Sequence, residues 1–177
     1  FLILFVLDKN EIHLTFMREA LKQAKLAKSI NEVPIGAVII KNSKIIGSGY
    51  NQNISSHSVS AHAEIVAINE AGSFLKNYRL VDCDMYVTVE PCHMCAKAIV
   101  DARLRNLYFA TPEPKSGAII SIDSFLKKKF LNHVVNYEYG FLQEDCRNII
   151  KNFFLSKRGW GYFVMIHCKP VPPLKIL

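Results

Sequence analysis

Residues 86–95 read YVTVEPCHMC and mark the point where a predicted strand passes into a predicted helix. The aromatic and β-branched residues that open this stretch favour a strand. Pro91 ends it, because proline lacks the N–H group that a strand ladder needs. Residues 94–101 then predict a helix, with Cys92 just before its N-terminal end. A strand that leads directly into a helix is typical of an α/β fold.

The alternation of strands and helices continues on both sides of this stretch. Apolar residues recur every three or four positions over residues 16–27 and predict an amphipathic helix. The further predicted elements are a hairpin over 35–46, a loop over 51–60, a helix over 61–68, strands over 106–110 and 134–137, a loop over 111–117 and a helix over 142–157. This order predicts helices packed on one sheet, an α/β sandwich.

Length and composition fit one globular domain. The chain has 177 residues, half of them apolar, and no repeating period, which excludes collagen-like, low-complexity and solenoid chains. We expect a domain over residues 1–158, with an apolar extension at 1–10, and an irregular tail over the proline-containing residues 159–177. The apolar run at 1–7 is too short to span a bilayer, which takes about 20 helical residues, so no membrane association is expected.

The positive charge is concentrated in the second half of the chain. The formal net charge is +7, and residues 1–96 contain equal numbers of acidic and basic side chains, so the whole excess lies in residues 97–177. A basic surface favours a polyanionic partner, since cations that neutralise phosphates release counterions. A solvated basic surface without a partner is the alternative, and charge alone does not decide between them.

The cysteines form a poor disulfide framework. They lie at positions 83, 92, 95, 146 and 168, an odd number with only one close pair. In a domain of this size the pattern indicates a metal or redox site and favours a cytoplasmic location. We expect Cys83 and Cys146 to be small buried hydrophobic residues. Phe153 and Phe154 are expected in the core, although one of the two could point outward.

Cys92 and Cys95 place two thiols three positions apart at a helix start, where they can bind one metal ion. Alone, this motif could be a redox pair or half of a structural zinc site. His62, thirty residues earlier and also at a predicted helix start, supplies a third ligand. A catalytic zinc site has three protein ligands and leaves the fourth position for water. Glu64, two residues beyond the histidine, could then transfer protons.

A fourth protein ligand would instead make the site structural. The candidates lack a motif-like spacing and are His57, Cys83 and His93. The combination of H-x-E with P-C-x-x-C is a signature of zinc-dependent nucleobase deaminases, which favours the catalytic interpretation. Two thiolates and an imidazole suit zinc well.

The chain resembles the bacterial tRNA-specific adenosine deaminases. The resemblance covers about residues 12–158 and is strongest in these segments: EVPIGAV at 32–38, AHAEI at 61–65, LVD at 80–82, YVTVEPCHMC at 86–95 and KSGA at 115–118. It implies the cytidine deaminase fold, a three-layer α/β/α sandwich with a five-stranded mixed sheet. It also implies a homodimer whose active sites lie near the subunit interface.

Transferred to this sequence, the resemblance makes His62, Cys92 and Cys95 the ligands of one zinc ion per subunit. It makes Glu64 the proton shuttle and Asn51 a contact to the target nucleoside. The implied reaction is hydrolytic deamination at C6 of a flipped adenine, which releases ammonia and leaves inosine.

The implied substrate is the wobble adenosine in the anticodon stem-loop of an arginine tRNA with an ACG anticodon. Single-stranded RNA loops are bound by backbone charge together with base stacking. We therefore expect RNA contacts from the loop after the fourth strand and from the last long helix, namely Lys115, Phe154, Lys157 and Arg158. Glu113 stands where the family usually has aspartate, between two prolines, and is a candidate ribose contact.

Two other functions remain open at this point. One is a deaminase of the same superfamily that acts on a free base or nucleotide, such as guanine or cytidine monophosphate. Such an enzyme would not need salt-sensitive RNA binding. The other is a catalytically inactive, zinc-stabilised RNA-binding module or partner subunit. The presence of Glu64 argues against that alternative, because a module without catalysis is free to lose the acid.

Overall fold

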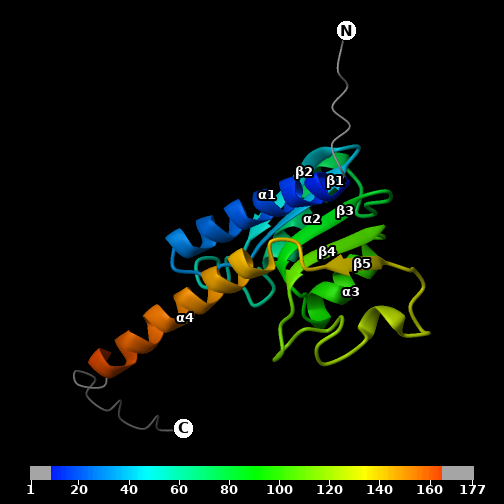
Figure 1. Ribbon diagram of the computed structural model, residues 1–177. Helices are drawn as coiled ribbons and strands as arrows, with labels where there is room; N and C mark the ends of the chain where they lie inside the picture. The colour runs from blue at the N-terminus through cyan, green and yellow to red at the C-terminus, as the bar shows by residue number, and fades with distance from the viewer. Residues whose placement is uncertain (1–8, 165–177) are drawn as a thin grey trace, which may run out of the picture.

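The computed structural model describes the backbone of residues 9–164 and the side chains of residues 10–157 (Figure 1). Its centre is a five-stranded sheet in the order β2-β1-β3-β4-β5. The strands are β1 (Gly36–Lys41), β2 (Lys44–Tyr50), β3 (Asp84–Val89), β4 (Asn106–Thr111) and β5 (Asn136–Tyr139). Strand β1 pairs antiparallel with β2 and β3, whereas β3 with β4 and β4 with β5 pair parallel. The predicted mixed sheet is therefore confirmed.

Helices cover both faces of this sheet. Helices α1 (Lys9–Ser29) and α4 (Gln143–Val164) lie on one face, and α2 (Ala63–Leu75) and α3 (His93–Asp101) lie on the other (Figure 1). A short 3-10 helix, η1 (Phe125–Lys127), interrupts the loop between β4 and β5. The three-layer α/β/α sandwich predicted from the sequence is confirmed.

The three central strands, β1, β3 and β4, each supply alternate side chains to two separate hydrophobic cores. Met85 and Phe109 belong to the core under α2 and α3, whereas Tyr86 and Tyr108 belong to the core under α1 and α4. This division follows from the two-residue period of a strand, which sends successive side chains to opposite faces. Because both faces are covered, the central strands are mostly apolar.

Helix α2 packs unusually close to strand β2 because two glycines lie beneath it. A Cβ atom on Gly49 would lie 2.3 Å from the carbonyl oxygen of Ala63, and one on Gly47 would lie 2.5 Å from that of Ala67. Both neighbours are backbone atoms, so larger residues would push the helix away. The pair of glycines thus sets the position of α2, at whose N-terminus His62 and Glu64 lie.

The structure corrects the predicted ends of several elements, among them the helix expected over 61–68, which runs from Ala63 to Leu75 as α2. Helix α4 continues to Val164, whereas irregular structure was expected from residue 159. No proline interrupts residues 143–164, and an established helix can include Gly159 and Gly161 at a cost of about 1 kcal/mol each. Helix α1 begins at Lys9, and β5 lies two residues later than predicted, where Asn136 pairs with Asn106. Residues 1–8 and 165–177, which include most of both terminal segments, lie outside the described part.

The described residues include no helix that is both long enough and apolar enough to cross a membrane.

Candidate metal and active site

The predicted site residues meet where the N-termini of α2 and α3 approach each other. His62 immediately precedes α2, and Cys92 immediately precedes α3, each with extended backbone angles. Cys95 follows one turn into α3 and is fully buried. A helix N-terminus carries unpaired N–H groups and a positive partial charge, so it stabilises thiolates placed there.

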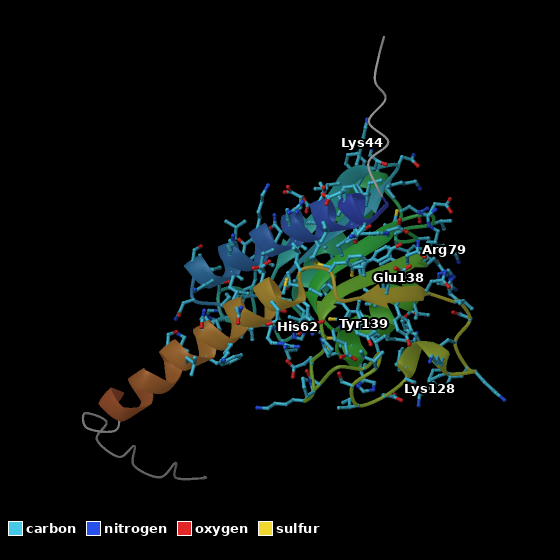
Figure 2. The ribbon with its side chains drawn as sticks, in the orientation of Figure 1. Lys44, His62, Arg79, Lys128, Glu138 and Tyr139 are labelled. Atoms are coloured by element: carbon cyan, nitrogen blue, oxygen red, sulfur yellow. The ribbon has the colours of Figure 1, made fainter. Side chains whose placement is uncertain are left out.

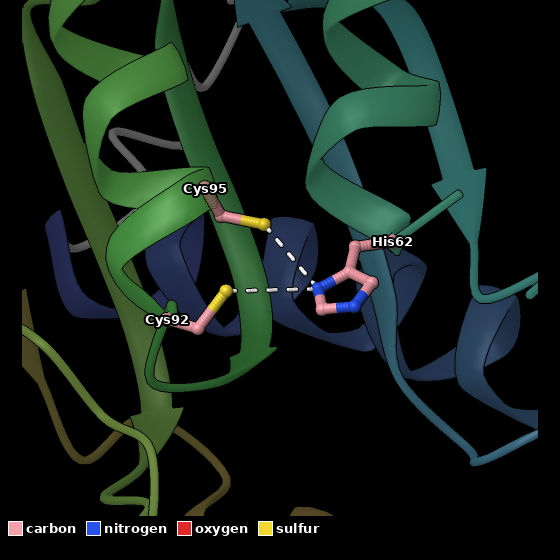
Figure 3. A group of neighbouring side chains, drawn as sticks. All are labelled: His62, Cys92 and Cys95. Atoms are coloured by element: carbon pink, nitrogen blue, oxygen red, sulfur yellow. Dashed lines mark hydrogen bonds between the residues drawn. The ribbon is translucent and has the colours of Figure 1, made fainter. Parts of the chain in front are cut away.

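The three side chains point at a common centre, as Figure 3 shows. The Nδ1 atom of His62 lies 3.7 Å from Sγ of Cys92 and 3.5 Å from Sγ of Cys95. All three donor atoms lie within 4.8 Å of one another. In a tetrahedral zinc site the bond lengths to sulfur and nitrogen imply a sulfur–nitrogen separation of about 3.6 Å. The arrangement therefore fits zinc both in donor type and in spacing.

The two thiols differ strongly in their protonation. The pKa of Cys92 is lowered to about 3, chiefly by the hydrogen bond from Cys95 and also by the hydrogen bond from His62. Burial of the thiol acts in the opposite direction and raises its pKa. The pKa of Cys95 is raised, because it donates its proton to Cys92 and because it is buried. A metal ion binds thiolates, so the proton of Cys95 must leave when a metal binds.

Glu64 is buried in the first turn of α2, with 4 % of its surface exposed. Burial raises the pKa of its carboxyl group, while its own backbone N–H and the neighbouring His62 act in the opposite direction. A carboxyl group with a raised pKa keeps its proton to a higher pH than an exposed carboxyl group does, which suits a general acid and base.

Asn51 directly follows β2 and is also buried, with 5 % exposure. Its Oδ1 accepts a hydrogen bond from the backbone N–H of Ala63 at 2.9 Å. This bond satisfies one of the free N–H groups at the start of α2. It also orients the side-chain amide, so that Nδ2 is the group that can donate to a substrate.

The candidates for a fourth ligand lie apart from this group. His93 Nε2 contacts the Asp123 carboxylate at 3.1 Å, and Cys83 is a buried residue whose thiol faces the carbonyl of Val81. His57 lies in the loop before α2 with a positive φ of 54°. Among the described residues, the cluster that could hold a metal consists of three side chains, which leaves a coordination position for water.

A cavity of about 590 Å³ is lined by strand ends, the β4–η1 loop and helix α4. Three of the predicted RNA contacts line it, namely Glu113, Lys115 and Phe154. Phe154 is 46 % exposed, whereas Phe153 is buried. The sequence had left open that one of these two phenylalanines points outward. The cavity lining is completed by Val33, Ile35, Val89, Ser116, Ile150, Lys151 and Leu155.

The other two predicted contacts are not part of this cavity lining. Lys157 donates a hydrogen bond to Oδ1 of Asn31 and lies 5.3 Å above the Phe153 ring. The side chain of Arg158 lies outside the described part. Conversely, sequence reasoning assigned no RNA contact to Lys151, although a basic residue on the exposed side of the last helix was a signal for it.

Fold and site together define the class of nucleobase deaminases, since H-x-E and P-C-x-x-C side chains meet at two helix starts. The chain matches the MafB19-like deaminase family over residues 11–158. It is 43% identical over 143 residues to a tRNA-specific adenosine deaminase of Streptococcus pyogenes serotype M1, an alignment that covers 81% of this chain and 84% of the relative. A protein of the same description from Rickettsia bellii (strain RML369-C) is 44% identical over 144 residues, with 80% and 99% coverage.

A solved structure agrees with these relatives. It comes from a study of A-to-I editing by tRNA:A34 deaminases at the wobble position of transfer RNA, and it superposes with a TM-score of 0.75 at 38% identity. The superposition covers 76% of this chain and 98% of the other. The chain therefore belongs to the MafB19-like deaminase family, and its curated relatives are tRNA-specific adenosine deaminases.

Proposed function

We propose that this protein is a hydrolytic adenosine deaminase that converts the wobble adenosine of a tRNA to inosine. The observation that carries the proposal is the three-donor cluster of His62, Cys92 and Cys95. The buried carboxyl group of Glu64 lies at the start of α2, as His62 does. The names of the relatives at 43% and 44% identity support a tRNA adenosine as the substrate.

His62 Nδ1 and the two sulfur atoms would hold a zinc ion, in agreement with their spacing and chemistry. When bound, zinc acts as a Lewis acid that activates water for hydrolysis. Glu64 would accept one proton from the attacking water and deliver it to the adenine ring. It would then accept the second proton, that of the hydroxyl group added at C6, and deliver it to the amino group, which leaves as ammonia. The burial of Glu64 supports this role, because burial raises the pKa of its carboxyl group and so favours the protonated form that donates.

The cavity provides room for part of an RNA loop, although the metal-site residues and Glu64 are not part of its lining. Its volume of about 590 Å³ lies within the range of small-molecule sites and can accept a nucleotide that flanks the target adenosine. The exposed ring of Phe154 can stack on a base, and Lys115 and Lys151 can contact phosphates. Asn51 donates to the target nucleoside, and Glu113 contacts its ribose.

We further propose a cytoplasmic homodimer. Large apolar side chains are exposed in the loop before α2 and in the segment after η1, with Val59 at 87 %, Phe130 at 72 % and Val134 at 76 % exposure. Burial of such side chains between two subunits would remove apolar surface from water. Light scattering coupled to size-exclusion chromatography tests this part, and a monomer at micromolar concentration would contradict it.

The function is tested by measuring inosine in a transcribed arginine tRNA with an ACG anticodon. Free adenosine, guanine and cytidine monophosphate are assayed in parallel with the zinc-loaded protein. We expect inosine at the wobble position and no turnover of the free compounds. Glu64→Ala should retain zinc and RNA binding but lose turnover by about 10²–10⁴-fold, the usual contribution of general acid–base catalysis.

The other outcomes separate the alternatives. Turnover of only a free base or nucleotide would retain the metal chemistry but reassign the substrate. RNA binding without any turnover would indicate an inactive binding module. Full turnover by Glu64→Ala would contradict the proposed proton transfer.

A further inference from the structure

Glu90 lies between β3 and α3 and is almost completely buried, with 3 % exposure. Its Oε1 atom accepts hydrogen bonds from three successive backbone N–H groups, those of Ile119 at 2.9 Å, Ile120 at 2.7 Å and Ser121 at 3.0 Å. Its Oε2 atom accepts from the backbone N–H of Glu113 at 3.0 Å and from the hydroxyl group of Ser121. One carboxylate therefore binds both ends of the segment 113–121.

Gly117, inside the same segment, allows the backbone to pass directly over this carboxylate. A Cβ atom at Gly117 would lie 2.3 Å from both Cδ and Oε2 of Glu90, and 2.7 Å from the carbonyl oxygen of Glu113. Because the glycine is itself buried, a side chain could not turn outward to avoid the contact. The segment is thus shaped around the Glu90 carboxylate.

The segment held by Glu90 forms one wall of the cavity described above. Glu113, Lys115 and Ser116 all line that cavity, as does Val89, the residue that precedes Glu90. On the other side, Glu90 is followed by Pro91 and then by Cys92. Glu90 therefore joins the RNA-facing wall to the backbone that carries the metal ligands.

We propose that Glu90 is a positioning residue that holds the segment 113–121 in the conformation required for RNA binding. Its consequence for the substrate rests on the function proposed above. Glu90 acts through the residues of the segment, since its own carboxylate is occupied by their N–H and hydroxyl groups. Hydrogen bonds to an ionised acceptor are stronger than neutral ones, which suits a carboxylate that orders a loop.

Glu90→Gln tests this role with little change in volume. The glutamine carbonyl oxygen can still accept from one set of N–H groups, but its NH₂ group cannot accept from the other. If the NH₂ group takes the place of Oε2, it puts a second donor opposite the N–H group of Glu113, and that hydrogen bond is lost. A matched control is Glu70→Gln. Glu70 on α2 accepts hydrogen bonds from both the N–H and the hydroxyl group of Ser48, as Glu90 does from Ser121. Ser48 lies on the edge strand β2, away from the segment 113–121.

Three measurements are made on the full chain. In Glu90→Gln, the rate of hydrogen–deuterium exchange should rise at least tenfold in peptides that cover 113–121. The exchange rates in β3 and β4 should stay unchanged. Zinc content should stay at the wild-type value. For an anticodon stem-loop RNA, KM should rise about tenfold while kcat changes less than threefold. Glu70→Gln should leave the exchange at 113–121 and the KM unchanged.

Ser121→Ala removes only the hydroxyl contact and should move exchange and KM in the same direction by a smaller factor. It keeps the proposal testable if Glu90→Gln does not fold. Unchanged exchange at 113–121 in both variants would overturn the proposal, as would loss of zinc together with faster exchange in β3. Faster exchange with an unchanged KM would overturn the role in RNA binding. If the wild-type protein does not act on RNA, the proposed function fails, and the exchange data still decide whether Glu90 holds the segment.

Discussion

At the scale of single residues, burial decides how the cysteines behave. Cys146 lies in the first turn of α4 and is fully buried, and burial, with a smaller effect of Asp145, raises the pKa of its thiol to about 12. Burial also raises the pKa of Cys83. Both residues therefore stay neutral in the folded chain, in contrast to Cys92. This agrees with their expected role as small hydrophobic residues.

Alkylation with iodoacetamide, followed by peptide mass spectrometry, checks this difference. Because the thiolate is the form that attacks the reagent and displaces iodide, Cys146 should remain unmodified in the folded protein up to about pH 10 and react quickly once guanidinium unfolds the chain. The unfolded thiol loses its proton near its ordinary pKa of 9.0, while the folded one keeps it up to about 12. The contribution of Cys146 to stability is thus complete below pH 9 and falls as the pH rises further. Equal modification rates in the folded and unfolded chain would contradict this.

At the scale of elements, the contact between β2 and α2 depends on the absence of side chains. Gly49→Ala would place a Cβ atom 2.3 Å from the carbonyl oxygen of Ala63 and 2.6 Å from the backbone nitrogen of Ala67. Because neither backbone atom can move independently of the helix, we expect a loss of about 1–3 kcal/mol in the free energy of unfolding. Denaturant unfolding followed by circular dichroism measures it.

Gly72→Ala in the same helix is the matched control. Its nearest contact would be the carbonyl oxygen of Asn77 at 3.4 Å, and its backbone conformation is helical. Alanine favours a helix over glycine by about 0.5–1 kcal/mol, so this variant should be more stable than the wild type. If Gly49→Ala were as stable as Gly72→Ala, the close packing of α2 on β2 would be wrong.

At the scale of the whole molecule, a metal ion would join the two helices that carry its ligands. His62 belongs to the start of α2, and both cysteines belong to α3. A ligand present at about 1,000 times its dissociation constant stabilises the folded state by about 4 kcal/mol. Removal of zinc by a chelator should therefore lower Tm by roughly 8–16 °C, since 1 kcal/mol shifts Tm by about 2–4 °C at this size.

Differential scanning calorimetry with and without the chelator measures this effect. Cys92→Ser provides the control, because its Tm should already be low and should not respond to the chelator. A wild-type Tm that is insensitive to chelation would show that the cluster does not bind a stabilising metal.

RNA binding should depend on the basic side chains around the cavity. Each phosphate contact contributes about −0.7 to the slope of log affinity against log salt for single strands. Lys151→Gln should therefore reduce the magnitude of the slope for an anticodon stem-loop RNA by about 0.7. Lys44→Gln removes the same charge from the first residue of β2, away from His62 in Figure 2, and should leave the slope unchanged. Fluorescence anisotropy titrations at several salt concentrations provide the slopes, and equal slopes for both variants would exclude a Lys151 contact.

The class of fold and the chemistry of the candidate site could be predicted from the amino-acid sequence. Strands, helix starts and the H-x-E and C-x-x-C spacings are local features, because they depend on backbone periodicity and on residues within one or two turns. The resemblance of the segment 86–95 and its neighbours to known deaminases indicated the substrate class as well. RNA contacts from the last helix were also expected from the sequence. Of the residues named there, Phe154 lines the cavity.

Which distant segments come together at the site could be seen only in the folded chain. His62 and Cys92 are thirty residues apart in sequence, and their approach depends on how α2 and α3 pack on one face of the sheet. The role of Glu90 was hidden, because its hydrogen-bond partners lie 23 to 31 residues away. The extension of α4 to Val164 was missed because the sequence after residue 159 shows no clear period. Such features arise from long-range packing and hydrogen bonding, which local sequence patterns do not encode.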